Sequence, residues 1–297
     1  MARATRVAVA AALLVGAVGA GGQADAGPSG WCTFDDKTGI VRIGGAAQLG
    51  VGATKDGVLR WGEAPVSYPT WFDFTVCDGG GKFVTLDVVK RIDITAAAGS
   101  TTRGDSNWVI VYDEAFSGDG PVEGAPPSGL AHVLISVMGP GNLLLSARLG
   151  PDQPMVTVRP GGVDRDGDGQ LDLRYITKPE GLHVQLGDVP GGVTFDAAAY
   201  DLPGLSVRGG GGGDVIQGSD QADSLFGLYG NDTVIGRGGD DKIWGDWGID
   251  QLDGGAGDDE IVGAGDAEPD LVIGGADTDT CWVGSNDAQP VSCELVY

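Results

Sequence analysis

The sequence predicts an all-β protein in which a β-rich N-terminal domain runs into a C-terminal parallel β-roll. Three observations support this prediction. Residues 209–282 repeat in units of nine, residues 31–205 consist of short Val-, Ile- and Thr-rich segments between Gly, Pro and Asp, and no long segment has the 3.6-residue apolar period of a helix. The expected division is a signal peptide at 1–26, the β-rich domain at 27–205, the roll at 206–282 and a disulfide-closed cap at 283–297.

The first 26 residues have the features of an export signal. Arg3 and Arg6 precede the apolar segment Val7–Ala20, and residues 24–26 (ADA) match a small-residue cleavage site. The apolar segment is short for a bilayer span, and no later segment is apolar enough to form one. We therefore expect an extracellular protein without a transmembrane segment, with the cell surface and the periplasm as alternative locations.

The four cysteines fit an oxidising compartment. Of the possible pairings, proximity in sequence favours Cys32–Cys77 and Cys281–Cys293. The second bond would close a short loop just after the last repeat. Because a solenoid needs capped ends, both bonds are expected to be structural.

Residues 27–205 are long enough to bury a core, and either a sandwich or an irregular solenoid that continues into the roll fits them. From Leu182 onward the spacing between apolar segments becomes shorter, which suggests that the chain begins to coil before the roll. Strands are expected at Gly39–Ile43, Val58–Trp61, Trp71–Cys77, Phe83–Ile94, Trp108–Tyr112, His132–Met138, Asn142–Leu149, Met155–Arg159, Leu171–Ile176 and Leu182–Leu186.

The segment DRDGDGQLD at 164–172 has the spacing of a calcium loop. Acids stand at places 1, 3, 5 and 9, and a glycine at place 6 allows the sharp turn of an EF-hand loop. Place 12 is Tyr175 rather than Glu and no helix flanks the loop, so it is expected to bind calcium between strands; an acidic hairpin turn is the alternative. The expected ligands are Asp164, Asp166, Asp168, Gln170 and Asp172.

Each nine-residue unit has an Asp at the sixth place and an apolar residue two places later. After an insertion at 267–269, the Asp and the apolar residue still recur, but with altered spacing. Glycines allow the turn, and the last three places form a short strand. Successive units reverse direction, so two units close one coil and alternate turns stack on one edge. One predicted column contains Asp214, Asp232, Asp250 and Asp270; the other contains Asp223, Asp241, Asp259 and Asp279.

Stacked carboxylates require a cation. Coils lie about 4.8 Å apart, and two like charges at that spacing repel by roughly 1 kcal/mol even in water. Ca²⁺ accepts about 6–8 oxygen ligands in flexible geometry, whereas Mg²⁺ demands a tighter octahedron. The alternative is a Gly- and Asp-rich disordered linker, but a linker has no reason to place an aliphatic residue in every unit.

The motif GGxGxDxUx, repeated from Gly209 to Trp282, resembles the RTX, or haemolysin-type calcium-binding, repeats of secreted bacterial proteins. The resemblance implies several Ca²⁺ ions, each between turns n and n+2 and held by the sixth-place Asp and by carbonyl groups of the glycine turn. The turns that match best begin at Gly227, Gly236, Gly245 and Gly254. The second unit, GSDQADSLF, lacks most of these glycines.

Composition excludes some classes of function. The formal net charge is −24, and residues 209–281 contain 17 acids against Arg237 and Lys242, so a nucleic-acid partner is not expected. The two histidines, His132 and His183, lie in apolar alternating segments, and neither H-E-x-x-H nor G-x-S-x-G occurs. A pair of acids for glycoside hydrolysis remains open, because it needs only closeness in space.

The sequence therefore favours an exported calcium-binding protein whose roll folds when Ca²⁺ binds, since metal-binding free energy becomes folding free energy in such a site. We expect a structural, matrix or adhesion module whose partner is an extracellular matrix, polysaccharide or cell-surface component. The alternative is a secreted hydrolase with its active site in 31–205 and the roll as a folding or secretion aid.

Overall fold

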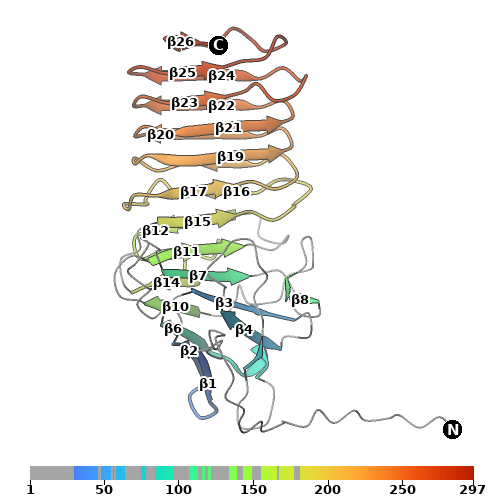
Figure 1. Cartoon of the computed structure of the whole chain (residues 1–297), viewed down its shortest axis with the longest axis vertical. Helices are drawn as coiled ribbons and strands as arrows, with labels where there is room; N and C mark the ends of the chain where they lie inside the picture. Colours follow the sequence, from blue (N-terminus) through green and yellow to red (C-terminus); the bar gives the residue numbers. More distant parts are fainter. Residues whose placement is uncertain are drawn as a thin grey trace, which may run out of the picture.

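The computed structural model describes residues 30–45, 48–54, 56, 58–63, 75–77, 84–95, 107–112, 116–117, 120–121, 134–138, 143–148, 155–165, 167–176 and 181–297. Two 12-stranded sheets, here called sheet A and sheet B, run along a single stack of coils (Figure 1). Within the described ranges, the one helix is a short 3₁₀ turn, Leu86–Val88. The predicted all-β class is therefore confirmed.

The strands of each sheet are given in their spatial order. Sheet A contains β1 (Trp31–Asp35), β2 (Ile40–Gly44), β6 (Arg91–Thr95), β10 (Leu134–Met138), β14 (Leu173–Tyr175), β13 (Gly162–Asp164), β12 (Met155–Arg159), β16 (Thr194–Asp196), β18 (Val215–Gln217), β20 (Thr233–Gly238), β22 (Gln251–Ala256) and β24 (Leu271–Ala276). Sheet B contains β26 (Leu295–Val296), β25 (Thr280–Trp282), β23 (Glu260–Val262), β21 (Lys242–Trp247), β19 (Asp223–Tyr229), β17 (Leu205–Arg208), β15 (Gly181–Gln185), β11 (Leu143–Arg148), β7 (Asn107–Tyr112), β3 (Gln48–Ala53), β4 (Leu59–Glu63) and β5 (Thr75–Val76). A separate hairpin joins β8 (Phe116–Ser117) and β9 (Gly120–Pro121).

Most coils contribute one strand to each sheet, so the neighbours within a sheet are parallel. For example, β18, β20, β22 and β24 pair in sheet A, while β19, β21, β23 and β25 pair in sheet B. The partners are 18 residues apart, or 20 across the insertion at 267–269, which leaves the pairing intact. The predicted alternation of units between two edges is therefore present.

The core fills the space between the sheets. The apolar residue of each repeat is at most 1% exposed and lies opposite its counterparts in the neighbouring coils. Burying one such aliphatic side chain contributes about 1.5–3 kcal/mol. These residues are Ile216, Leu225, Val234, Ile243, Leu252, Ile261, Val272 and Cys281.

Of the two architectures considered for 27–205, the described residues form the irregular solenoid. The parallel series β15–β17–β19 crosses the boundary expected at 205/206 without a break. Six expected segments contain or overlap β2, β4, β7, β12, β14 and β15, whereas the strand expected over Phe83–Ile94 is interrupted by the 3₁₀ turn Leu86–Val88. Parts of other expected strands, among them Trp71–Phe74 and His132, lie outside the described residues.

One coil differs from the rest. Sheet B passes directly from β11 to β15, but sheet A passes from β10 through β14, β13 and β12 to β16. The strand β13 is antiparallel to both of its neighbours, so this coil contributes three strands to sheet A and one to sheet B. The loop 164–172 joins β13 to β14 and so lies within this insertion.

Both disulfides that the sequence predicts are present, and each lies at one end of the solenoid. Cys32 lies in β1 at the end of sheet A, and it is bonded to Cys77, which follows β5 at the same end of sheet B. At the other end, Cys281 of β25 is bonded to Cys293. The first bond therefore joins the two sheets, and the second closes the last coil.

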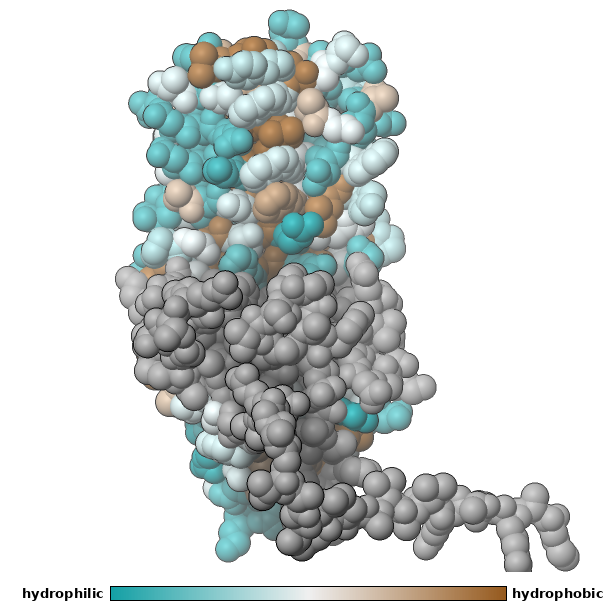
Figure 2. Space-filling model, in the orientation of Figure 1, coloured by the Kyte–Doolittle hydropathy of each residue, from teal (hydrophilic) through white to brown (hydrophobic). Residues whose placement is uncertain are grey.

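The outer face of sheet B carries a row of aromatic side chains along the stack. The guanidinium of Arg208 lies 5.1 Å from the ring centre of Phe226, and Phe226 stacks on Trp244 with their ring centres 4.6 Å apart. Farther along, Trp282 stacks on Tyr297 at 5.6 Å. Figure 2 shows hydrophobic residues lying among hydrophilic ones on the face of the roll turned toward the viewer. Such cross-strand pairs stabilise neighbouring coils.

Candidate calcium sites

The sixth-place carboxylates form a hydrogen-bonded ladder along each edge of the roll. The N–H of Asp223 donates to Oδ1 of Asp241, and the N–H of Asp241 donates to Oδ1 of Asp259, both at 2.8 Å. On the other edge, the N–H of Asp232 donates to Oδ1 of Asp250 at the same distance. The ladder reaches both Asp residues that follow the insertion, at 2.8 Å for Asp270 and 2.9 Å for Asp279. The two predicted columns are therefore present.

The second oxygen of six of these carboxylates has no hydrogen-bond partner, although the side chains are at most 2% exposed. The six are Asp232, Asp241, Asp250, Asp259, Asp270 and Asp279. Native proteins almost always satisfy buried polar atoms, so six such oxygens in repeated positions point to a cation that completes them.

The space beside these oxygens is lined by backbone carbonyl groups. A Cβ atom added at Gly236 would overlap Oδ2 of Asp241 and the carbonyl oxygen of Gly254 in the next turn of the same edge. The same holds at Gly227, where the overlapping atoms are Oδ2 of Asp232 and the carbonyl oxygen of Gly245. Glycine at the first place of these turns thus leaves room for two facing oxygens, and Ca²⁺ would bind them by supplying positive charge between them.

Burial raises the pKa of these acids. Loss of hydration raises the pKa of Asp241 to about 8 and the pKa of both Asp232 and Asp270 to about 7. The hydrogen bond from the preceding turn opposes the shift, and neighbouring carboxylates add to it. A carboxylate that is costly to ionise alone is a favourable partner for a divalent cation.

The turns themselves are strained at their second place. Leu228, Arg237 and Asp246 have φ of 78°, 86° and 68°, in the left-handed region that is unfavourable for side chains. Such a residue costs of order 1–3 kcal/mol and persists only where its surroundings hold it. In each of these three turns, Oδ2 of the sixth-place Asp has no hydrogen-bond donor.

Among the described residues, no three His, Cys, Asp or Glu side chains come together around a common point. An ion between two stacked turns must therefore take most of its ligands from backbone carbonyl groups. That division fits the preference of Ca²⁺ for mixed carboxylate and carbonyl oxygen.

The first turn of each edge differs from the later ones. Both oxygens of Asp214 accept hydrogen bonds, from the N–H of Val193 at 2.7 Å and from the N–H of Gly210 at 2.9 Å. Oδ2 of Asp223 accepts from the N–H of Ser219 at 2.6 Å, and the Ser219 hydroxyl lies 3.1 Å and 3.0 Å from its two oxygens. These two acids belong to the columns but have donors of their own.

A second ladder, at the fifth place of the repeat, is one that the sequence reasoning missed. Oδ1 of Asp240 accepts from the N–H of Asp258 at 3.0 Å, and Oδ1 of Asp258 accepts from the N–H of Thr278 at 2.9 Å. Asn231 does the same for the N–H of Ile249 at 3.0 Å. The pairs Asn-Asp and Asp-Asp that precede the strands are the sequence signal for it.

The loop 164–172 is closed by its own hydrogen bonds. Asp164 is fully buried, its Oδ1 accepts from the N–H of Gly167 at 2.8 Å, and its Oδ2 accepts from the N–H of Gly169 at 2.9 Å. Oδ2 of Asp172 accepts from the N–H of Arg165 at 2.8 Å. Two of the expected ligands are thus already in use as acceptors.

The other expected ligands of this loop are exposed or lie outside the described residues. Oδ1 of Asp168 accepts from the N–H of Gln170 at 2.7 Å, and both side chains are exposed. Asp166 lies outside the described residues. The loop joins the antiparallel strands β13 and β14, so its backbone is that of a hairpin connection.

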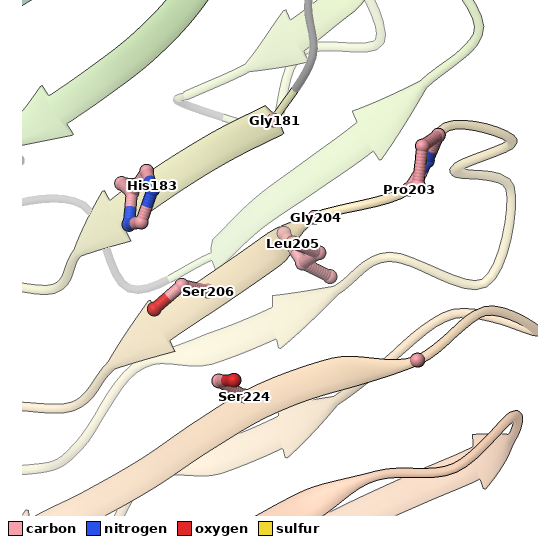
Figure 3. A pocket seen from close by; sticks show the side chains of 8 residues that line it. Gly181, His183, Pro203, Gly204, Leu205, Ser206 and Ser224 are labelled. Carbon is pink, nitrogen blue, oxygen red and sulfur yellow. The ribbon is translucent and has the colours of Figure 1, made fainter. Parts of the chain in front are cut away.

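A hollow of about 550 Å³ lies on the outer face of sheet B, where His183, Ser206 and Ser224 follow one another across β15, β17 and β19 (Figure 3). Burial lowers the pKa of His183. The eight residues that line the hollow include no acid, so they alone do not form a Ser-His-acid arrangement. His183 is a strand residue, as its sequence pattern predicts, and His132 lies outside the described part.

Comparison with protein families agrees with the geometry of the roll. Residues 208–243, 244–281 and 264–287 match the profile of the RTX calcium-binding nonapeptide repeat, in four copies. The C-terminal part of this chain is therefore similar to RTX calcium-binding nonapeptide repeats, which bind several Ca²⁺ ions. Searches of curated proteins and of solved structures found no match. Across the described ranges, no helix has the length and apolar character needed to cross a membrane.

Proposed function

We propose that this is an exported protein whose roll becomes ordered when Ca²⁺ binds, and that it serves as a structural module outside the cell. One observation carries the proposal: six buried carboxylate oxygens have no donor, and those of Asp232, Asp241 and Asp259 lie beside a carbonyl group of the next stacked turn. Without a cation these oxygens oppose folding, because each is removed from water without compensation. With Ca²⁺ bound, the same oxygens hold successive coils together.

Circular dichroism and limited proteolysis test this proposal on the full mature chain. We expect strand content and protease resistance to be high with Ca²⁺, lower with excess EDTA, and restored by Ca²⁺ but not by equal Mg²⁺. If the two preparations gave the same spectrum and the same digestion pattern, folding would not depend on calcium and the proposal would fail.

We further propose that the loop 164–172 binds Ca²⁺ through Asp164, Asp166, Asp168, Gln170 and Asp172. The turn glycines Gly167 and Gly169, with φ of 75° and 88°, support a compact loop. Both oxygens of the buried Asp164 accept hydrogen bonds from these glycines, so binding through Asp164 requires Ca²⁺ to displace those donors. Native mass spectrometry of Asp168→Asn should count one ion fewer than the parent protein. The exposed Asp201→Asn, which removes the same charge outside the loop, should leave the count unchanged; equal losses in both would contradict the assignment.

Export is supported by the two disulfides, which need an oxidising compartment. Expression with and without residues 1–26, followed by fractionation, tests the signal. We expect the complete chain outside the cytoplasm, shortened at its N-terminus, and the truncated chain inside with reduced cysteines. A complete chain retained inside at its full length would contradict the assignment.

A structural role in a matrix or in adhesion is supported by the unbroken stack of coils and by a bond at each end. Its partner would be an extracellular matrix, polysaccharide or cell-surface component. Co-sedimentation with insoluble polysaccharides and with purified cell envelopes, in Ca²⁺ and in EDTA, tests this. Binding in Ca²⁺ alone would support the role, and no binding under either condition would argue against adhesion.

A further inference from the structure

Six of the nonapeptide turns fall into two conformations. In the turns of Asp214 and Asp223, the N–H of the second-place residue, Gly210 or Ser219, donates to Oδ2 of the turn's own Asp at 2.9 Å and 2.6 Å. In the turns that begin at Gly227, Gly236, Gly245 and Gly254, the second-place residue has positive φ. Oδ2 of the Asp then has no partner. We name these the self-capped turn and the open turn.

Both self-capped turns have the same carbonyl group nearby as the open turns. A Cβ at Gly218 would lie 2.6 Å from the carbonyl oxygen of Gly236 and 2.7 Å from Oδ2 of Asp223. The difference is therefore the donor and not the oxygen lining. In the turn of Asp223, the N–H and hydroxyl of Ser219 occupy the carboxylate that is bare in the turn of Asp241.

Each self-capped turn also touches the part of the solenoid that precedes the regular repeats. Asp214 accepts from the N–H of Val193, 21 residues earlier, in a coil without the repeat motif. Asp223 begins β19, which pairs with β17 of that earlier region. The first coil of the roll is thus fixed by bonds to protein donors, whereas every later carboxylate retains one bare oxygen.

We infer that the ion sites begin with Asp232 and Asp241, and that Asp214 and Asp223 are not calcium ligands but the ion-independent start of the two columns. In this inference, the hydroxyl and N–H of Ser219 and the N–H of Gly210 take the place of the ion. The first coil then acts as a template on which the calcium-dependent coils order. The inference rests on the proposed function, since it divides the roll into parts that do and do not need Ca²⁺.

Hydrogen exchange of the unaltered protein, followed by mass spectrometry, tests the template. In EDTA, we expect β17, β18 and the first half of β19 to stay protected, while residues 227–282 exchange rapidly; Ca²⁺ should then protect 227–282. Loss of protection throughout 205–282 in EDTA would overturn the inference but leave the proposed function standing. Equal protection with and without Ca²⁺ would instead overturn the proposed function.

Ion counting by native mass spectrometry provides an independent test with matched variants. Asp223→Asn should bind as many Ca²⁺ ions as the parent protein, whereas Asp241→Asn, its neighbour in the same column, should bind at least one fewer. Ser219→Gly and Ser219→Ala both remove the hydroxyl but keep the backbone N–H that donates to Oδ2 of Asp223, as the N–H of Gly210 does in the turn of Asp214, so neither variant should gain an ion.

Two outcomes would contradict the inference: an equal loss of ions in Asp223→Asn and Asp241→Asn, or a gain of one ion in Ser219→Gly. Far-ultraviolet circular dichroism in Ca²⁺ identifies any variant that fails to fold. If a variant fails to fold, the hydrogen-exchange experiment, which uses the unaltered protein, still tests the inference.

Discussion

The main-chain N–H of Asp223 donates to Oδ1 of Asp241, 18 residues farther along the chain, at 2.8 Å. The contact places the side chain of one turn against the backbone of the turn below it on the same edge. Because Asp241 donates in the same way to Asp259, each carboxylate both orients a neighbouring turn and is oriented by it. From Asp232 onward, one oxygen of each acid therefore maintains the stack, and the other has no hydrogen-bond partner.

This geometry predicts an unusual pH dependence for the calcium-free protein. Burial raises the pKa of Asp241 to about 8 from 3.8, and that of Asp232 to about 7. Between about pH 4 and pH 8 the folded roll therefore holds more protons than the unfolded chain, so its stability falls as pH rises. Thermal unfolding in EDTA should occur at a higher temperature at pH 5 than at pH 8.

Calcium should reverse this trend, because an ion replaces the protons. In excess Ca²⁺ the unfolding temperature should not fall between pH 5 and pH 8, and binding at pH 7 should release protons that a weakly buffered titration can measure. If the calcium-free protein instead became more stable toward pH 8, Asp232 and Asp241 would not have the raised pKa values on which this prediction rests.

Replacing one carboxylate of the ladder should weaken the roll even with calcium present. Asp241→Ala removes the acceptor of the buried N–H of Asp223, and an unsatisfied buried donor costs about 1–3 kcal/mol. Urea denaturation in Ca²⁺ should show this loss in the free energy of unfolding. Glu268→Ala removes an exposed acid from the same roll and should change it by less than about 0.5 kcal/mol. Similar losses in both variants would argue against the ladder.

The first-place glycines should not tolerate a methyl group. In Gly236→Ala the new Cβ would overlap Oδ2 of Asp241 and the carbonyl oxygen of Gly254, so the turn would have to open. Calcium affinity, measured by isothermal titration, should fall. Gly238→Ala lies in the same turn, where its Cβ would meet its nearest atoms at 3.8 Å, and should bind Ca²⁺ like the parent protein. If Gly236→Ala bound Ca²⁺ with the affinity of the parent protein, the ion would not lie between Oδ2 of Asp241 and the carbonyl oxygen of Gly254.

The bond Cys281–Cys293 should stabilise the last coil. Cys281 supplies the buried core residue of β25, and Cys293 precedes β26, which pairs only with β25 in sheet B. Replacing both cysteines by serine should cost about 2–4 kcal/mol of unfolding free energy. Hydrogen exchange should localise the change to β25 and β26, and an even change along the chain would contradict a local role.

The repeat made the roll predictable. A nine-residue period with an apolar residue at one fixed place determines which coils are neighbours, so the core residues from Ile216 to Cys281 and both Asp columns follow from counting. The insertion at 267–269 displaces Asp270 and Asp279 in sequence only, because the extra residues are taken up in a turn and the strand pairing β22–β24 keeps its register. Proximity in sequence was enough to pair the cysteines.

Other features depend on contacts that no local pattern reveals. Asp214 stands in a unit with five consecutive glycines, yet its Oδ2 accepts from the N–H of Gly210, a bond that the glycine content of the unit does not reveal. The strand β3 contains glycine at alternate positions, which hides its pattern, and the short β13 exists because β12 and β14 flank it. In the segment expected as one strand over Phe83–Ile94, the 3₁₀ turn Leu86–Val88 interrupts the chain, and β6 begins only at Arg91.

The extra hairpin in sheet A has a mechanical consequence. Strands lie about 4.8 Å apart, so two additional strands lengthen sheet A by about 10 Å at a point where sheet B gains nothing. The one-to-one correspondence between the strands of the two sheets is therefore lost at this coil, and the loop 164–172 lies at the tip of the inserted hairpin. A change in the length of that hairpin would shift the register of sheet A against sheet B for every coil that follows.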